Sequence, residues 1–302
     1  MDWQQQLKYR YATANMMEKL IAINVIMLIL MYLSRTIGFL MQINTDFLIN
    51  WLVFPKELGE FIIKPWTIIT YAFMHSGFFH ILFNMIILYF SGQIFLTFFS
   101  PKRLLNYYIL GAISGALIYM LSYNLFPAFS SVGNSYLIGA SASVMAVLVG
   151  IATQVPNYTV RLILIGNIKL WWIAAFFVGL DIAQIPLGNA GGHLAHIGGA
   201  LIGYTYTQQL TKGNDFGQFV TSSFDYLGDF FSGQSKPKMK TVYKNKAKQA
   251  KEKNKQSAKS TTVNRTEKQK RVDEILDKIS KSGYDSLTKE EKDFLFDAGK
   301  DI

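Results

Sequence analysis

Apolar residues are concentrated in six runs along the chain, each bounded by polar or charged residues. The runs cover residues 20–41, 78–99, 104–126, 136–153, 168–183 and 190–207. A transmembrane helix needs about 20 mostly apolar residues, so the first three runs are long enough to cross a bilayer. The last three are shorter and richer in glycine, which is typical of helices that end in a protein-lined cavity. The pattern predicts an all-α membrane protein built on a bundle of six transmembrane helices.

Lysine and arginine residues indicate how this bundle is oriented. They precede the first run, lie between the second and third and between the fourth and fifth, and follow the sixth. Loops rich in these residues stay in the cytosol, so both termini are predicted to be cytosolic. The first 19 residues lack the order of segments in a signal peptide, and none is expected. The loop 42–77 is amphipathic and rich in aromatic residues, and we expect it to lie partly in the outer leaflet.

A few polar side chains interrupt the apolar runs near their non-cytosolic ends. They are Ser141 in the fourth run, His193 and His196 in the sixth, and His80 and Asn84 in the second, with His75 just before it. Polar groups are costly in lipid and usually face a bundle interior or a wet cavity, where they serve function. Because these three runs cross in the same direction, the side chains are predicted to lie in one shallow layer.

These residue types can carry out hydrolysis. A serine hydroxyl attacks an amide only when a base takes its proton, and His196 is the best candidate for the base of Ser141. His80 and Asn84 are four residues apart, so they project from one helix face and could donate to the oxyanion. Asp181 is the only carboxylate in the last three runs and is placed near the outer end of the fifth. We expect no acid to orient His196, and therefore a Ser–His dyad.

Two other interpretations of these residues remain open. Small residues recur every fourth position in the fourth and sixth runs, as at Gly199 and Gly203, so the serine could serve helix packing alone. Alternatively, the four histidines of the chain could bind a metal ion on neighbouring helices. The absence of a His-Glu-x-x-His motif, and of an expected carboxylate beside the histidines, argues against a metal. No cofactor is expected.

Charge and composition separate the end of the chain from the apolar part. The 302 residues carry a net charge of +10, yet residues 236–271 hold 14 Lys/Arg and 2 Glu, a net of 14 − 2 = +12. Residues 212–271 are predicted to be a basic, disordered linker. It serves either as a solvated spacer or as a binder of anionic lipids, and nucleic acid is not expected. Residues 272–302 are predicted to form a small helical hairpin, with Thr288 as an N-cap and Glu291 three residues later.

Three short motifs resemble those of the rhomboid family of intramembrane serine proteases. They are His80-Ile81-Leu82-Phe83-Asn84, Gly139-Ala140-Ser141-Ala142 and Ala195-His196-Ile197-Gly198-Gly199, in the family's order. The resemblance covers residues 60–207 and implies a six-span core with an appended cytosolic tail. It implies Ser141 as nucleophile, His196 as general base, and His80 and Asn84 as oxyanion-hole donors. It also implies an endopeptidase of a bacterial plasma membrane that cleaves transmembrane segments of other proteins without ATP or metal, at a site toward the non-cytosolic face.

The chain departs from the family's motifs at three positions. Ala142 stands where the family has a glycine after the serine, Thr67 where it often has an arginine, and Met145 where it often has a tyrosine. These departures bear on rate and substrate choice more than on mechanism. A rival hypothesis is an inactive relative that binds or scaffolds membrane proteins, with the basic tail as the contact. The expected organisation is a cytosolic segment 1–19, a membrane domain 20–211, the linker 212–271 and the hairpin 272–302.

Overall fold

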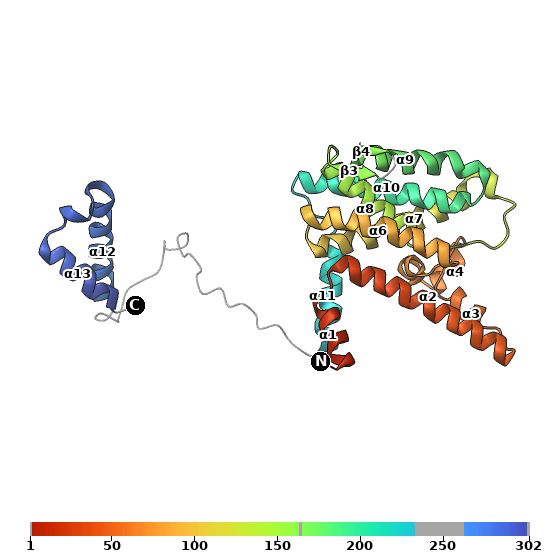
Figure 1. Ribbon diagram of the computed structural model, residues 1–302, viewed down its shortest axis with the longest axis horizontal. Helices are drawn as coiled ribbons and strands as arrows, with labels where there is room; N and C mark the ends of the chain where they lie inside the picture. Colours follow the sequence, from red (N-terminus) through yellow and green to blue (C-terminus); the bar gives the residue numbers. More distant parts are fainter. Residues whose placement is uncertain (1, 163–164, 233–262, 301–302) are drawn as a thin grey trace, which may run out of the picture. The chain divides into compact units, whose positions relative to one another are not determined.

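The computed structural model describes residues 2–162, 165–232 and 263–300, and its contacts divide the chain into two compact units, 1–236 and 237–302 (Figure 1). Six long helices make up most of the first unit. They are α2 (Met16–Met41), α6 (Phe78–Phe98), α7 (Pro101–Leu125), α8 (Ser141–Gln154), α9 (Leu170–Gln184) and α10 (Ala190–Thr211). Each of the six apolar runs therefore contains one helix.

The other described elements of the first unit lie outside the apolar runs or at their ends. The α-helices are α1 (Trp3–Thr13), α3 (Asp46–Asn50), α4 (Leu58–Ile63), α5 (Thr67–Thr70) and α11 (Gln218–Ser232). Three 3₁₀ turns are η1 (Tyr71–Phe73), η2 (Pro127–Phe129) and η3 (Ile185–Leu187). The connection from α2 to α6 is thus a chain of short helices and turns, in keeping with the amphipathic composition of residues 42–77.

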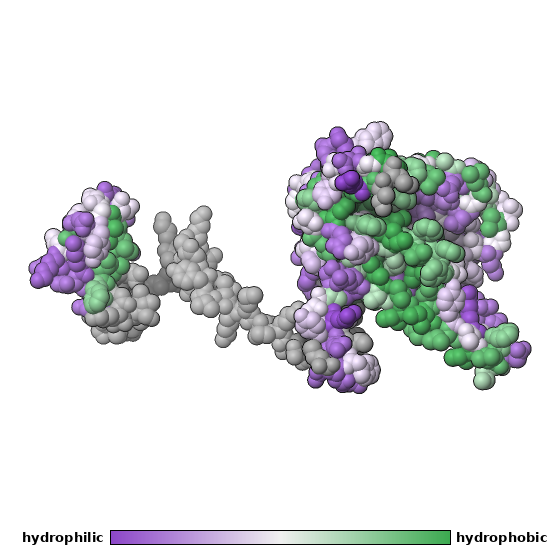
Figure 2. All heavy atoms as spheres, in the orientation of Figure 1, coloured by the Kyte–Doolittle hydropathy of each residue, from purple (hydrophilic) through white to green (hydrophobic). Residues whose placement is uncertain are grey.

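Four helical segments of the described chain are long and apolar enough to cross a membrane. They are Met16–Met41, Phe78–Phe98, Pro101–Leu125 and Leu170–Leu187, while Ser141–Gln154 is apolar but shorter. Large apolar side chains are exposed along α2, including Ile26, Leu30 and Leu33, each more than half accessible. Figure 2 shows this as a continuous apolar surface on α2 and on part of the neighbouring bundle. Such a surface requires lipid around it, so the chain is a membrane protein.

Helix α8 lies at the centre of the first unit, packed against α6, α7 and α10. Small residues allow its backbone to approach its neighbours, as the spacing of alanine and glycine predicts. A Cβ atom added at Gly199 of α10 would lie 2.0 Å from the Ala142 carbonyl oxygen, and one at Gly203 would lie 2.4 Å from that of Ala146. Backbone contacts this close leave no room for any side chain at these glycines.

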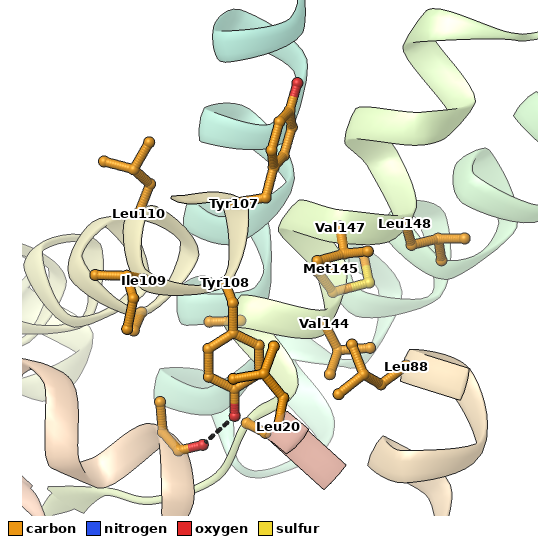
Figure 3. Packing of buried hydrophobic residues seen from close by; sticks show 14 of the residues in the cluster. Leu20, Leu88, Tyr107, Tyr108, Ile109, Leu110, Val144, Met145, Val147 and Leu148 are labelled. Carbon is orange, nitrogen blue, oxygen red and sulfur yellow. Dashed lines mark hydrogen bonds between the residues drawn. The ribbon is translucent and has the colours of Figure 1, made fainter. Parts of the chain in front are cut away.

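Larger side chains fill the space on the other faces of α8. Figure 3 shows Val144, Met145 and Leu148 of α8 beside Leu88 of α6, with Tyr108 of α7 nearby, and all five are buried. The Tyr108 hydroxyl donates to the Ala72 carbonyl at 2.7 Å, the hydrogen bond drawn in Figure 3. A buried hydroxyl without a partner would be costly, so this bond fixes η1, the turn that leads into α6, against α7.

Two short antiparallel sheets correct the expectation of a purely α-helical chain. Strand β1 (Phe54–Pro55) pairs with β2 (Tyr136–Leu137), and β3 (Thr159–Leu162) pairs with β4 (Gly166–Lys169). The β3–β4 hairpin occupies a loop whose few alternating residues gave no clear strand signal. The β1–β2 pair joins the long loop 42–77 to the segment just before Ser141.

The second unit contains α12 (Val263–Ser282), the turn η4 (Tyr284–Ser286) and α13 (Lys289–Lys300). The expected capping box is present, because the Thr288 N–H donates to Glu291 at 2.8 Å and the Glu291 N–H to the Thr288 hydroxyl at 3.3 Å. Glu291 also pairs with Lys278 of α12 at 2.9 Å.

The expectation of a disordered segment over residues 212–271 is wrong at both of its ends. Helix α11 covers Gln218–Ser232, and α12 begins at Val263. Apolar residues in the first stretch give α11 one apolar face, which stabilises a helix against a larger body. The middle of that segment, residues 233–262, lies outside the described residues.

Candidate active site

Ser141 is the first residue of α8 and follows a tight turn. Gly139 has a φ of +128°, a conformation that residues with a side chain rarely adopt. Its N–H donates to the Tyr71 carbonyl at 3.1 Å. A Cβ at Gly139 would lie 2.6 Å from the His80 ring, so only glycine allows the turn to approach that histidine. The N–H groups of the first turn of α8 lack partners within the helix.

His196 lies nearly two turns into α10, which begins at Ala190, and faces Ser141. Its Nε2 atom is 2.6 Å from the Ser141 Oγ atom, a short hydrogen bond. The close contact between Gly199 of α10 and Ala142 of α8 explains this distance. Gly199 is three residues after His196, and Ala142 directly follows Ser141, so the contact brings the two side chains together. The two residues that the sequence paired are therefore brought together by helix packing.

Asp181 contradicts the expectation that no acid orients the histidine. Its Oδ1 atom is 2.7 Å from His196 Nδ1 and 2.8 Å from His193 Nδ1. The 3₁₀ turn Ile185–Leu187 joins α9 to α10, so the end of one helix lies beside the start of the next. The sequence contained the signal, since an ionisable residue in an apolar run is by default a candidate functional group. Asp181 lies near the outer end of its run, and the histidines lie at that same end of theirs.

The hydrogen bonds of Asp181 determine which nitrogens carry hydrogen. A carboxylate only accepts, so both histidines donate from Nδ1 when they are neutral. The Nε2 atom of His196 then carries a lone pair and accepts the hydrogen of Ser141. This is the tautomer that a general base requires.

His80 and Asn84 lie on α6 across from Ser141. The Ser76 N–H donates to His80 Nδ1 at 3.4 Å, and the Ser76 hydroxyl lies 3.0 Å from the same atom. Nδ1 is therefore an acceptor, which leaves the hydrogen on Nε2, the atom beside Gly139. Asn84 donates one amide hydrogen to the His80 carbonyl at 2.9 Å and keeps its second for another acceptor. Both side chains can thus donate toward one point.

These groups line one cavity of about 590 Å³. Its polar lining includes Ser76, His80, Asn84, Ser141, Asp181 and His196, and its apolar lining comes from aromatic and aliphatic side chains of α6, α7, β2, α8 and α9. The volume suits a peptide segment of a few residues. The polar groups converge on one side of an otherwise apolar pocket, the arrangement expected of a ligand or substrate site.

The three departures from the rhomboid motifs have distinct structural surroundings. The Ala142 methyl faces Gly115 of α7, where a Cβ would lie 2.5 Å from it, and Ala142 does not line the cavity. Met145 lines the cavity wall. Thr67 is buried and donates to the Lys64 carbonyl at 2.6 Å. The added methyl is therefore accommodated between helices rather than beside the serine.

Lys64 anchors the loop in which the family often has an arginine. Its ammonium group donates to the Asn50 carbonyl at 3.0 Å and pairs with Glu60 at 2.6 Å. Trp66 stacks on Trp51 with ring centroids 5.5 Å apart and donates to the Trp51 carbonyl at 2.8 Å. These contacts hold the loop together around Thr67.

Asp181, His193 and His196 also have the residue types of a metal site. Their ligand atoms lie within 4.8 Å of one another, so the premise that no carboxylate lies beside these histidines is wrong. His75 and His80 are not part of this group in the described chain. Each of the three ligand atoms already has a hydrogen-bond partner within the group, which satisfies them without an ion.

His75 is fully buried in the connection between η1 and α6, outside the membrane-spanning helices. Burial, together with a smaller contribution from the neighbouring His80, lowers the pKa of His75 from 6.5 to about 3, while the Phe73 backbone opposes the shift. Its ring lies edge-on to that of His80, with centroids 5.0 Å apart. The neutral His75 ring therefore packs against His80, the histidine that faces Gly139.

The shifted pKa of His75 predicts a loss of stability in acid. Below a pH of about 6.5 the unfolded chain binds a proton at His75 that the folded protein takes up only near pH 3, so stability falls across this range. The slope is at most about 1.4 kcal/mol per pH unit. Unfolding midpoints at pH 7, 6, 5 and 4 should fall more steeply for the wild type than for His75→Gln. Parallel curves for the two proteins would contradict the assignment.

Comparison with known proteins gives two family matches. Residues 63–212 match the Rhomboid domain, and residues 259–298 match a family of unknown function (DUF6576). The first match contains the whole of α6 to α10 and every candidate site residue. The second covers α12 and most of α13.

Three curated relatives are each similar to more than half of this chain. RHOMBOID-like protein 12, mitochondrial, of Arabidopsis thaliana is 29% identical over 190 residues, which are 56% of this chain and 56% of that protein. Presenilin-associated rhomboid-like protein A, mitochondrial, of Danio rerio is 28% identical, covering 57% of this chain and 47% of that protein. Rhomboid protease GlpG of Haemophilus influenzae is 28% identical, covering 58% of this chain and 82% of that protein.

The chain thus spans about half the length of the first two of these relatives. The Rhomboid domain match covers α6 to α10. On the domain match and these relatives, the chain is a membrane protein of the rhomboid family.

Proposed function

We propose that this protein is an intramembrane serine endopeptidase that cleaves transmembrane segments of other membrane proteins. The observation that carries the proposal is the 2.6 Å contact between Ser141 Oγ and His196 Nε2 inside the cavity of a rhomboid domain. A relative of this chain bears the name rhomboid protease, which agrees with this chemistry. A serine that served packing alone would not need a histidine in hydrogen-bonding geometry.

The reaction follows from the positions of these two side chains. As Ser141 Oγ attacks the carbonyl carbon of the scissile peptide bond, its proton moves to His196 Nε2. His196 then gives that proton to the leaving amine nitrogen as the C–N bond breaks, which leaves an acyl-serine. A water molecule attacks this ester, gives its proton to His196, and the proton returns to Ser141 as the acid product leaves.

Donors beside the serine stabilise the oxyanion of each tetrahedral intermediate. His80 Nε2–H, the free amide hydrogen of Asn84 and the Ser141 N–H are the groups we propose for this role. A buried donor of this kind contributes about 2.7–4 kcal/mol to transition-state stabilisation, more than the same bond would in water.

The setting proposed for the enzyme follows from the apolar runs and their flanking charges. We propose six membrane crossings with both termini in the cytosol of a bacterial plasma membrane, and a cavity open toward the other face. Substrate enters laterally, because a membrane helix cannot reach a serine in this bundle from water. The basic residues of 236–271 contact anionic lipids, and no metal or other cofactor takes part.

Labelling with a fluorophosphonate tests the proposal without knowledge of the substrate. The purified full-length protein in detergent should react, and fragmentation mass spectrometry should place the phosphonate on Ser141. The same protein unfolded before treatment is the control and should not react, since activation depends on the fold. No labelling of folded protein, or a phosphonate on another serine, would refute the proposed mechanism.

A further inference from the structure

We propose that Asp181 is a positioning residue for hydrolysis: its carboxylate holds His196 in the tautomer that can accept the Ser141 proton. This inference rests on the proposed function, and it adds Asp181 to the Ser141–His196 pair as a third, positioning residue. Asp181 lies on α9, whereas Ser141 lies on α8 and His196 on α10.

The geometry forms an unbroken line of hydrogen bonds. Ser141 Oγ is 2.6 Å from His196 Nε2, and His196 Nδ1 is 2.7 Å from Asp181 Oδ1. The two ring nitrogens of one histidine are thus occupied by the nucleophile on one side and the carboxylate on the other. A histidine that only bridged helices would not need both contacts in this order.

His193 supplies a second donor to the same carboxylate oxygen. Its Nδ1 atom lies 2.8 Å from Asp181 Oδ1, one turn before His196 on α10. Two donors on one oxygen restrict the rotation of the carboxylate, so Asp181 Oδ1 stays directed at His196. His193 has no hydrogen bond to Ser141 in the described structure, which agrees with a supporting role.

The Asp181 carboxylate can stabilise a charged His196 strongly because both side chains are mostly buried. The Asp181 side chain is 11% exposed and the His196 side chain 20% exposed. A buried carboxylate is costly unless it is hydrogen-bonded, and both of its donors come from these histidines. When His196 takes the serine proton, the imidazolium forms beside this negative charge, which stabilises it. The carboxylate keeps its charge throughout, because the proton resides on His196 and moves on to the leaving amine.

Asp181→Asn is the variant that tests the proposal. An asparagine has nearly the same shape, but its amide can donate to Nδ1 and so favours hydrogen on Nε2, the wrong nitrogen. We expect kcat for cleavage of a transmembrane substrate to fall by roughly 10²–10⁴-fold, with KM changed by less than about threefold. Asp181→Glu, which keeps the carboxylate, should recover part of the lost rate.

The tautomer itself provides a readout that a merely structural role would not change. The chain has only four histidines, so a protein labelled with ¹⁵N-histidine in detergent gives few ring signals. His196→Gln identifies which of them belong to His196. In the wild type, the His196 signals should show that the ring hydrogen is on Nδ1. In Asp181→Asn, the signals should show that a larger fraction of the protein has this hydrogen on Nε2. The matched control is Asp46→Asn, the same change at an exposed position of α3, which should alter neither kcat nor the spectrum.

The outcomes separate this inference from the proposed function. If the wild type cleaves and Ser141→Ala does not, but Asp181→Asn keeps most of its kcat and the wild-type tautomer, the positioning role is overturned alone. If the wild type neither cleaves nor reacts with fluorophosphonate, the proposed function fails, and the spectra still decide whether Asp181 sets the tautomer. One equivalent of zinc in the purified wild type that is lost in Asp181→Asn would make Asp181 a metal ligand and overturn the inference.

Discussion

Ser141→Ala should abolish cleavage of transmembrane substrates by the purified protein while leaving its fold intact. Removing the nucleophile of a serine protease lowers kcat by on the order of 10⁶-fold, a barrier increase of about 8 kcal/mol. No other described side chain hydrogen-bonds to His196 Nε2, so none can replace the serine. The measurement is the rate of appearance of cleaved substrate in detergent or liposomes, together with the unfolding temperature.

Ser143→Ala is the matched control for this prediction. Ser143 lies on the same helix, is fully buried, and its hydroxyl has no hydrogen-bond partner in the described part of the chain. Its loss should leave kcat within about twofold, since removal of a hydroxyl without a partner costs little. If Ser141→Ala retained a biological effect of the protein that depends on substrate binding alone, the scaffold hypothesis would be favoured instead.

Gly199→Ala should disrupt both the fold and the activity. The added Cβ would lie 2.0 Å from the Ala142 carbonyl oxygen and 2.8 Å from its carbonyl carbon. These are backbone atoms in a helix, so they cannot rotate away, and α8 and α10 must separate. We expect a loss of stability at or above the usual overpacking range of about 1–3 kcal/mol.

The same separation would move Ser141 away from His196. A displacement of about 1 Å at a catalytic contact costs about 10²-fold in rate, so residual folded protein should also be slow. Unfolding temperature and fluorophosphonate labelling of the variant measure the two effects. The control is Gly179→Ala on α9, where a Cβ meets nothing within 4 Å. That variant should fold and react like the wild type, and equal behaviour of the two variants would contradict the role of close packing.

The sequence predicts the main helices because lipid imposes a simple rule on a chain. Every backbone polar group within a bilayer must be satisfied inside its own helix, so apolar runs of sufficient length become helices. Each of the six runs contains a helix, from Met16–Met41 to Ala190–Thr211. The glycines that bring α8 and α10 together could also be identified, because they lie four residues apart and therefore on one face of the helix.

The candidate residues were identifiable for a related reason. Ser141, His196, His80 and Asn84 stand out because polar side chains are rare in such runs, and the rhomboid resemblance added their roles. The short strands gave no comparable signal, because each has only two to four residues and pairs through tertiary contacts, and helix α11 lies outside the runs.

Asp181 is the residue whose surroundings only the tertiary structure decided. Along the chain it is 15 residues from His196 and on a different helix. Whether the two meet depends on the angle at which the turn Ile185–Leu187 sends α10 back along α9, and on which face each helix presents. Hydropathy fixes the depth of a residue in the membrane, but it does not fix the rotation of one helix against another. The sequence therefore determined which polar groups share a layer of the membrane, and packing between helices determined which of them touch.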